Sequence, residues 1–517
     1  MPKTTDKPEW MTYPTAERKA PRFDMSLTNP DLAPVEPERR SWNWWHIASL
    51  WIGMAICIPT YTLASSLVER GWSWQAAVGS VVLGNVVVLV PMILNSHAGT
   101  KYGIPFPVLA RAPFGVLGSN VPAILRAVVA CGWFGIQTWI GGFAIFKLLE
   151  VLWPGIAQLP RVLPLWVGLG TGEALCFLLF WAINVWIVLR GMESIKLLET
   201  WGSPFLLAVG AALLIWAYVR AGGWGPMLAN PTTAVGSAAG SASSAAVRTG
   251  VWSVFGAGLT SAVAFWGTMA LSIPDFSRFA RSQRDQGVGQ AVGLPGTMAF
   301  FAFIGAAVTN ATAVIYGQRI ADPIALLARI GGPFIVVLSM LGLSIATLTT
   351  NLAANVVAPA NDFSNIAPHR IRFKTGALIT AAIGILMLPW RLYNDAAAYI
   401  FAWLIGYGAL LGPIAGIMIV DYFILRKREL LVEDLYRRGG AYEYSRGINW
   451  IAMLALAVGI APNLPGFLGA VGLIKASPLA TGIYDWAWFV GLAVASAVYF
   501  VGMRVVARAP QAAAHAG

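Results

Sequence analysis

Long apolar stretches separated by short polar loops run along almost the whole chain. A helix needs about 20 apolar residues to cross a bilayer, and windows of that kind begin near residues 44, 75, 121, 168, 197, 250, 293, 334, 373, 397, 447 and 485. The segment before the first window is polar and proline-rich, without the short apolar stretch of a cleavable signal. The pattern predicts an all-α integral membrane protein with about 12 transmembrane helices.

One apolar phrase occurs in both halves of the chain. Leu50–Tyr61 reads LWIGMAICIPTY and Phe265–Phe276 reads FWGTMALSIPDF, with Trp, Met, Ala, Ile and Pro in register. Each copy has Gly or Pro inside a predicted span, so that backbone N–H and C=O groups lose their helical partners and become available to a ligand. Simple kinks are the alternative. Matched breaks in two halves favour a transporter with its binding site at the bilayer midplane.

The two copies also predict how the chain is organised. Five crossings separate them, so the second copy runs through the membrane in the opposite direction, as expected for an inverted five-plus-five repeat with two helices appended. The expected segments are a flexible cytoplasmic tail at 1–43, the first repeat at 44–220, an outer Ala/Gly/Ser-rich linker at 221–249, the second repeat at 250–424, two appended helices with a cytoplasmic loop at 425–507 and a C-terminal tail at 508–517.

Composition and charge placement support a membrane location. Hydrophobic residues make up 57% of the chain, charged residues only 11%, and the mean hydropathy is +0.67. The net charge of +12 does not indicate nucleic acid, because the basic residues are spread over alternate loops. These loops would face the cytoplasm, and one of them carries Arg426, Lys427 and Arg428. The positive-inside rule then predicts a multi-pass protein of the inner or plasma membrane with both termini in the cytoplasm.

Little in the sequence indicates an enzyme or a cofactor. The chain has no HExxH or GxSxG motif and no paired carboxylates deep in the predicted spans. Its three cysteines, Cys57, Cys131 and Cys176, lie within spans, where a structural disulfide or metal cluster is not expected. Glu173 is the one candidate for a carboxylate that couples transport to protons, although its place near an outer span end favours a merely solvated role.

Aromatic and amide side chains suggest a site for a planar ring. The third span contains Trp133 and Gln137 at i and i+4, which puts an indole face beside an amide. Trp266 lies in the middle of the broken sixth span. An interfacial anchor is the alternative for Trp133, but Trp266 is harder to explain in that way.

The eighth span is unusually rich in Thr and Asn. Ala346, Thr349 and Thr350 lie close to one helix face, so one carbonyl and two hydroxyl oxygens could meet the broken first span and coordinate Na⁺. Asn351 and Asn355 are also neighbours on one face and could hydrogen-bond a heterocycle. The alternative for all these polar groups is helix packing or bonding back to their own helix.

Six stretches together resemble the nucleobase:cation symporter-1 family, whose members carry hydantoins, allantoin, uracil, cytosine, purines or related vitamins. They are NPDLAPVEPERRSW, GMAICIPTY, GWFGIQTW, ALSIPDFSRFARS, ATLTTNLAANVVAPAND and GPIAGIMIVDYF, and the likeness covers nearly the whole chain. The resemblance implies a leucine-transporter-type inverted repeat, in which a bundle of helices moves against a scaffold to give alternating access. It also implies secondary active transport and not catalysis.

The resemblance also implies roles for individual residues. Trp133 and Trp266 correspond to the two indoles that sandwich the substrate ring, and Gln137 and Asn355 to amides that bond it. In sodium-coupled members, the ion site corresponds to the carbonyls of Gly53, Ile56 and Ala346 and the hydroxyls of Thr349 and Thr350.

Two departures from the family pattern concern the size of the substrate. Cys57 stands where the hydantoin carrier has Gln, and Phe265 stands where it has Gly. A lost amide removes one polar contact and an added ring narrows the pocket, so a small ring such as allantoin, hydantoin or uracil is expected. The coupling ion is expected to be Na⁺, with H⁺ as the alternative, and no cofactor is expected.

The expected partners are therefore the heterocycle and the lipid bilayer, with no nucleic acid, and a monomer is a plausible state. The alternatives are an H⁺-coupled cytosine, purine or vitamin permease of the same family, an amino-acid transporter of the same fold, and a membrane receptor that does not transport.

Overall fold

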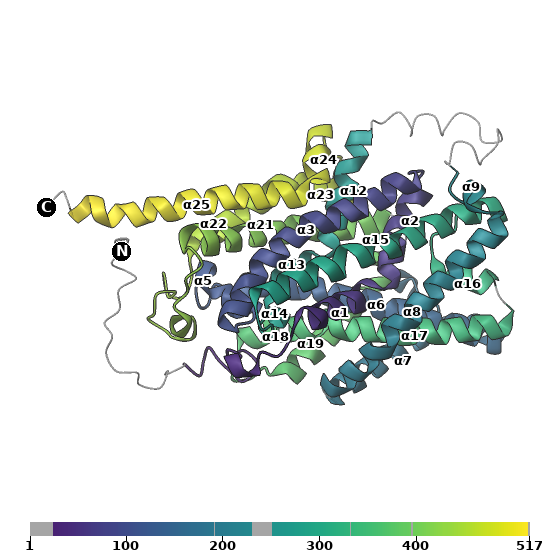
Figure 1. Cartoon of the computed structure of the whole chain (residues 1–517), viewed down its shortest axis with the longest axis horizontal. Helices are drawn as coiled ribbons and strands as arrows, with labels where there is room; N and C mark the ends of the chain where they lie inside the picture. The colour runs from purple at the N-terminus through teal and green to yellow at the C-terminus, as the bar shows by residue number, and fades with distance from the viewer. Residues whose placement is uncertain (1–23, 191, 230–250, 331, 394–396, 515–517) are drawn as a thin grey trace.

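The computed structural model describes residues 24–190, 192–229, 251–330, 332–393 and 397–514. Within these ranges the chain is helical, without a β-strand, and the long helices lie side by side along the long axis of the molecule (Figure 1). The predicted outer linker lies mostly outside the described residues. The expectation of an all-α protein is confirmed for the part described.

The first half of the chain contains the helices η2 (Pro37–Arg39), α1 (Trp44–Ala55), α2 (Ile58–Glu69), α3 (Trp74–Tyr102), α4 (Phe106–Leu109), α5 (Arg111–Phe114), α6 (Asn120–Leu152), η3 (Pro154–Gln158), η4 (Leu165–Val167), α7 (Thr171–Arg190), α8 (Met192–Ala221) and α9 (Trp224–Met227).

The second half contains α12 (Val251–Phe265), α13 (Gly267–Ser272), α14 (Pro274–Ser277), α15 (Gln283–Tyr316), α16 (Pro323–Ile330), α17 (Pro333–Asn355), α18 (Val357–Ile366), α19 (Phe373–Leu386), α20 (Pro389–Leu392), η5 (Ala397–Leu404), α21 (Ile405–Ile419), η6 (Val420–Leu425), η7 (Val432–Tyr436), α22 (Trp450–Ile460), η8 (Ala461–Asn463), α23 (Leu464–Ala470), α24 (Pro478–Asp485) and α25 (Ala487–Ala514).

Most of the predicted spans appear as long apolar helices. Among the described residues, eight helices are long and apolar enough to cross a membrane, and the bent pair α1 and α2 makes a ninth. Three shorter apolar helices, Leu207–Ala221, Phe255–Phe265 and Phe373–Leu386, fall where further spans were predicted. The total of twelve stays a prediction. The seventh span starts ten residues before the predicted position 293, because α15 opens with a polar turn that a hydropathy window does not detect.

The first span is broken where the repeated phrase predicts a break. α1 and α2 meet at an angle of 54°, and the backbone leaves the helical conformation at Ile56 and Cys57. Pro59 lies in the first turn of α2, a position that suits proline because its missing N–H would have no helical partner there. Gly53 lies inside α1 and not at the break itself.

The sixth span is also broken within its copy of the phrase. α12 ends at Phe265, Trp266 is non-helical, and α13 starts at Gly267. In register this break corresponds to Trp51, five residues before the break of the first span at Ile56. The eighth span is interrupted as well, because Val356 separates α17 from α18, and the sequence analysis did not predict this interruption.

The helices sort into two groups by their packing. The bundle group consists of α1, α2, α3, α13, α14 and α15, and the scaffold group consists of α6, α7, α17, α18 and α19. Glycines allow close approach within each group. A Cβ on Gly293 would lie 2.6 Å from the carbonyl oxygen of Ala48, and one on Gly142 would lie 2.6 Å from the Cα of Phe177. Contacts between the two groups are sparser than contacts within them.

The N-terminal segment differs from the flexible tail predicted for residues 1–43. From Asp24 onward it packs against the loops that were predicted to face the cytoplasm, with its leucines buried. The amide of Asn29 donates to carbonyls beyond the eighth span, at 3.2 and 3.3 Å. The Tyr436 hydroxyl donates to the carbonyl of Leu32 at 2.8 Å. The prediction of a flexible tail is wrong for residues 24–43, because a hydropathy window detects long apolar segments and not short contacts between loops.

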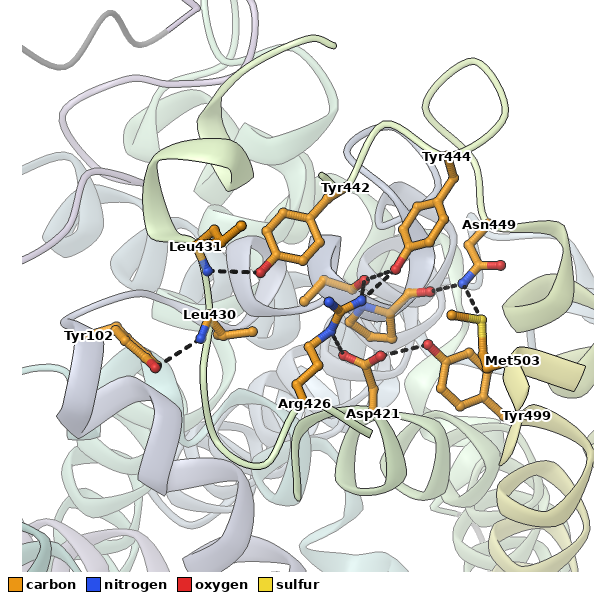
Figure 2. Close-up of polar contacts among 12 residues, drawn as sticks. Tyr102, Asp421, Arg426, Leu430, Leu431, Tyr442, Tyr444, Asn449, Tyr499 and Met503 are labelled. Atoms are coloured by element: carbon orange, nitrogen blue, oxygen red, sulfur yellow. Dashed lines mark hydrogen bonds and ion pairs between the residues drawn. The ribbon is translucent and has the colours of Figure 1, made fainter. Parts of the chain in front are cut away.

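The two appended helices are joined to the rest by a buried polar network (Figure 2). Asp421 lies between Arg426 and Tyr499. It accepts a hydrogen bond from the Arg426 guanidinium at 2.7 Å and another from the Tyr499 hydroxyl at 2.7 Å. Arg426 also donates to the Tyr444 hydroxyl at 2.6 Å and to the carbonyl of Ala112 at 3.1 Å. The network thus joins the end of the tenth span to α25 and to the loop after the second span.

The C-terminal helix also differs from the prediction. α25 continues to Ala514, whereas a tail was expected at 508–517.

Candidate functional site

A small cavity lies where the three broken spans approach the third span. Its volume is about 30 Å³, room for about two water molecules, so a ring can enter only if the walls move. Its lining consists of Met54, Cys57, Trp133, Gln137, Phe265, Trp266, Thr268, Met269, Thr350, Ala354 and Asn355. The sequence analysis named seven of these residues.

Aromatic rings form much of the wall of this cavity. The ring of Phe265 lies 5.3 Å from Trp133 and 5.1 Å from Trp266, centroid to centroid, and is edge-on to both. Trp51 makes a further edge-on contact with Trp266 at 5.1 Å. Phe265 therefore contacts both indoles, as expected for a ring that narrows the pocket.

Two polar atoms of the cavity wall are buried without a hydrogen-bond partner among the described residues. They are Oε1 of Gln137 and Nε1 of Trp266. Buried polar atoms are nearly always paired in folded proteins, so an unpaired acceptor and donor in one cavity wall favour a polar ligand between them. By contrast, Nε1 of Trp133 donates to the Tyr407 hydroxyl at 3.2 Å, which holds that indole in place.

The two asparagines of the eighth span differ in their surroundings. The amide of Asn351 donates to Thr138 and Asn184, both at 3.1 Å, and does not line the cavity. The packing alternative therefore describes Asn351 better than substrate contact. Asn355 does line the cavity, and its amide donates to the side-chain oxygen of Asn351 at 3.1 Å. Asn351 thus orients Asn355.

The residues expected to bind Na⁺ come from two spans. Gly53 lies in α1, Ile56 lies at the break of the first span, and Thr350 is a buried residue of the cavity wall on α17. Ala346 and Thr349 lie on the same helix, but their side chains are outside the described part. The ion site therefore stays a prediction.

A second and larger cavity of about 490 Å³ lies on the side predicted to face outward. Tyr399 is part of its wall and also contacts Trp133 of the small cavity, with ring centroids 6.2 Å apart, so the two cavities lie near each other. Glu173 lies in its wall and accepts a hydrogen bond from the backbone N–H of Gly170 at 2.8 Å. This contact fits a residue that caps the start of α7. Asp322 also lines this cavity.

Sequence reasoning missed four residues of the central cavity, Met54, Thr268, Met269 and Ala354. The repeat contained a signal for two of them, since Met54 and Met269 occupy the same position in the two copies of the phrase. Trp51 and Trp266 are matched in the same way, and they contact one another. Positions related by the repeat therefore meet around the cavity.

The chain is similar to permeases over most of its length. A family model described as a permease for cytosine/purines, uracil, thiamine and allantoin matches residues 34–491. The purine-uracil permease NCS1 of Arabidopsis thaliana is 46% identical over 94% of this chain and 79% of its own length. The allantoin permease of Bacillus subtilis is 40% identical over 93% of this chain and 94% of its own.

A solved structure shows the same fold. It is the nucleobase-cation-symport-1 family transporter Mhp1 in a closed conformation with bromovinylhydantoin bound. The TM-score is 0.74 and the sequence identity 26%, over 93% of this chain and 96% of that one. The leucine-transporter-type arrangement expected from the sequence is thereby confirmed.

Proposed function

Since the chain belongs to the permease family for cytosine/purines, uracil, thiamine and allantoin, we propose that it imports a small planar nitrogen heterocycle of the allantoin, hydantoin or uracil type together with Na⁺. The family and its solved member make the chain a multi-pass membrane transporter and not an enzyme. The proposal concerns the substrate, the ion, the residues that bind them, and an orientation with both termini in the cytoplasm.

The unpaired polar atoms beside the two indoles carry the substrate proposal. A flat ring stacked on indole gains about 0.5–1.5 kcal/mol beyond its burial. Stacked on Trp133, the ring would offer an N–H to Oε1 of Gln137 and would present a carbonyl oxygen at its edge to Nε1 of Trp266. The two named atoms lack partners among the described residues. Hydantoins, allantoin and uracil all carry N–H and C=O groups along the ring edge, so one molecule can satisfy both atoms.

The ion would supply the driving force. Moving one positive charge inward across about 100 mV releases roughly 2.3 kcal/mol, enough for about fifty-fold accumulation of the ring. Coupling requires that ion and ring stabilise the same conformation of the broken first span, so that each raises the affinity for the other. Gly53, Ile56 and Cys57 lie on that span, which brings the proposed ion ligands close to the ring site.

Binding in the absence of transport tests this coupling. The affinity of purified protein for labelled allantoin, hydantoin and uracil would be measured at fixed pH in Na⁺ and in choline. We expect Na⁺ to raise the affinity for one ring by about tenfold, within the usual range of allosteric coupling. If that ring binds equally well in both salts, the sodium proposal is wrong and H⁺ becomes the coupling ion.

Removing the Phe265 ring is predicted to widen substrate selection. In Phe265→Ala the space beside both indoles grows, so we expect binding of an aryl-substituted hydantoin to improve by about tenfold, worth about 1.4 kcal/mol. Affinity for unsubstituted hydantoin should change by less than about threefold. The matched control is Phe301→Ala, which removes a buried ring from α15 outside the cavity wall. An unchanged preference for small rings in Phe265→Ala would mean that Phe265 does not limit the pocket.

A further inference from the structure

A fully buried cluster of charged and polar side chains joins the two helix groups beside the central cavity. The guanidinium of Arg126 on α6 donates to the carboxylate of Asp362 on α18 at 3.0 Å. Its other terminal nitrogen donates to the hydroxyl of Ser272 on α13 at 2.9 Å. All three residues have no exposed surface. One arginine thus bonds to a scaffold helix and to a bundle helix at once.

Asp275 adds a second charge on the bundle side of this cluster. It lies on α14, is buried, and interacts electrostatically with Arg126 and Arg278. One of its oxygens accepts a hydrogen bond from the backbone N–H of Phe106 at 3.0 Å. Two polar atoms here, Nε of Arg126 and Oδ1 of Asp362, lack a partner among the described residues. The cluster is therefore buried and incompletely paired in this conformation.

The cluster lies on the side of the cavity that is predicted to face the cytoplasm. On the third span Arg126 is seven residues from Trp133 of the cavity wall, about 10 Å at a rise of 1.5 Å per residue, and on the eighth span Asp362 is likewise seven residues from Asn355. Ser272 lies closer, because its hydroxyl donates to the carbonyl of Thr268, a residue of the cavity wall, at 3.0 Å. The larger cavity opens on the other side. Any route from the cavity to the cytoplasm between the third, sixth and eighth spans must pass this cluster.

We propose that Arg126 locks the inner gate of this transporter, which means that it holds the cytoplasmic side of the cavity closed. Asp362 keeps Arg126 on the scaffold group, and the interactions of Arg126 with Ser272 and Asp275 are lost when the bundle group moves away. The pairing with Asp362 joins two scaffold helices and need not break. The hydrogen bond to Ser272 and the electrostatic attraction to Asp275 cross between the groups and must be lost if a passage opens there. The gate proposal rests on the proposed transport cycle but not on which ring or ion is carried.

The burial of the cluster explains why such a lock can both hold and release. In the closed state the cluster is buried, so a charge-assisted hydrogen bond is strong and an ion without partners is costly. Once the sixth span moves, water enters, and the unpaired atoms of Arg126 and Asp362 gain partners. Charges interact far more weakly in water than in a protein interior, so the open state does not need the lock.

Labelling of a native thiol tests the gate without substrate or ion. Cys57 is buried in the wall of the central cavity, so a membrane-impermeant maleimide reaches it from the cytoplasmic face only when the inner route opens. The initial rate of Cys57 labelling in inside-out vesicles would be read by mass spectrometry for the wild type and for Ser272→Ala. Losing one hydrogen bond to a charged group should favour opening and raise this rate by about tenfold or more.

The next helix along the chain, α14, offers a matched control for Ser272→Ala. Ser277 on α14 is equally buried, but its hydroxyl donates to the carbonyl of Ser96 on α3, within the bundle group. Ser277→Ala should therefore label at the wild-type rate, whereas Asp275→Asn, which removes the charge facing Arg126, should label faster. Wild-type rates in both Ser272→Ala and Asp275→Asn, or an equal rise in Ser277→Ala, would overturn the gate proposal. These outcomes leave the transport proposal untouched, because no solute is present.

Discussion

Replacing Trp266 by Ala should weaken binding of the transported ring by about thirty-fold to a thousandfold, or roughly 2–4 kcal/mol. Trp266 lies at the break of the sixth span and is held by edge-on contacts with Trp51 and Phe265. Its Nε1 is one of the two unpaired polar atoms of the cavity wall. The substitution therefore removes a hydrogen-bond donor and part of the aromatic wall of the cavity together. Equilibrium binding of the labelled ring to purified protein measures the effect.

The control for Trp266→Ala is a tryptophan that does not reach the cavity. Trp450 at the start of α22 is 63% exposed in the isolated chain, so Trp450→Ala should leave the affinity within about twofold of the wild type. Trp133→Ala should resemble Trp266→Ala, because Trp133 forms the opposite aromatic wall. Wild-type affinity in both Trp133→Ala and Trp266→Ala would mean that the two indoles only pack against their neighbours, and it would contradict the proposed ring site.

Replacing Asp421 by Ala should destabilise the folded protein by about 3–5 kcal/mol, because it leaves a buried guanidinium without its carboxylate. Asp421 is 1% exposed and pairs with Arg426, whose side chain is 11% exposed. The Tyr499 hydroxyl on α25 loses its acceptor in the same variant. Thermal unfolding of the detergent-purified protein, followed by loss of the monodisperse peak, measures the change.

An exposed ion pair supplies the matched control for Asp421→Ala. Glu429 pairs with Lys101 at 3.0 Å, but these side chains are 65% and 34% exposed, and surface pairs of this kind contribute less than about 1 kcal/mol. Glu429→Ala should therefore unfold near the wild-type temperature. Adding Arg426→Leu to Asp421→Ala should restore part of the lost stability, because the unpaired charge is removed. Equal unfolding temperatures for Asp421→Ala and Glu429→Ala would mean that the buried network around Asp421 does not stabilise the folded protein.

The sequence contained enough information to predict the spans and the positions of two breaks. Apolar length decides whether a helix can cross a bilayer, and a hydropathy window detects that directly. The repeated phrase located the breaks because Pro and Gly within an apolar stretch have few other uses when they recur in both halves. The interruption at Val356 had a weaker signal. Pro359 lies in the first turn of α18 and cannot donate to the carbonyl of Asn355, but no repeated phrase marks this place.

The finer details of the site depend on contacts between distant segments. Asn351 and Asn355 are equivalent on a helical wheel, and only the neighbouring Thr138 and Asn184 show that the first packs while the second lines the cavity. In the same way, nothing local to Arg126 indicates that Asp362 and Ser272 will meet it. Tertiary contacts of this kind cannot be predicted from periodicity in one sequence.

Uptake into cells tests the central claim most directly. Cells that express the chain would be given labelled allantoin, hydantoin, uracil or cytosine at fixed pH, with Na⁺ present or replaced by choline. We predict that one small ring accumulates in Na⁺ and that its uptake collapses in choline, while cells with Trp266→Ala take up little of it in either salt. Uptake of no ring in either salt would contradict the claim that this chain imports a planar nitrogen heterocycle.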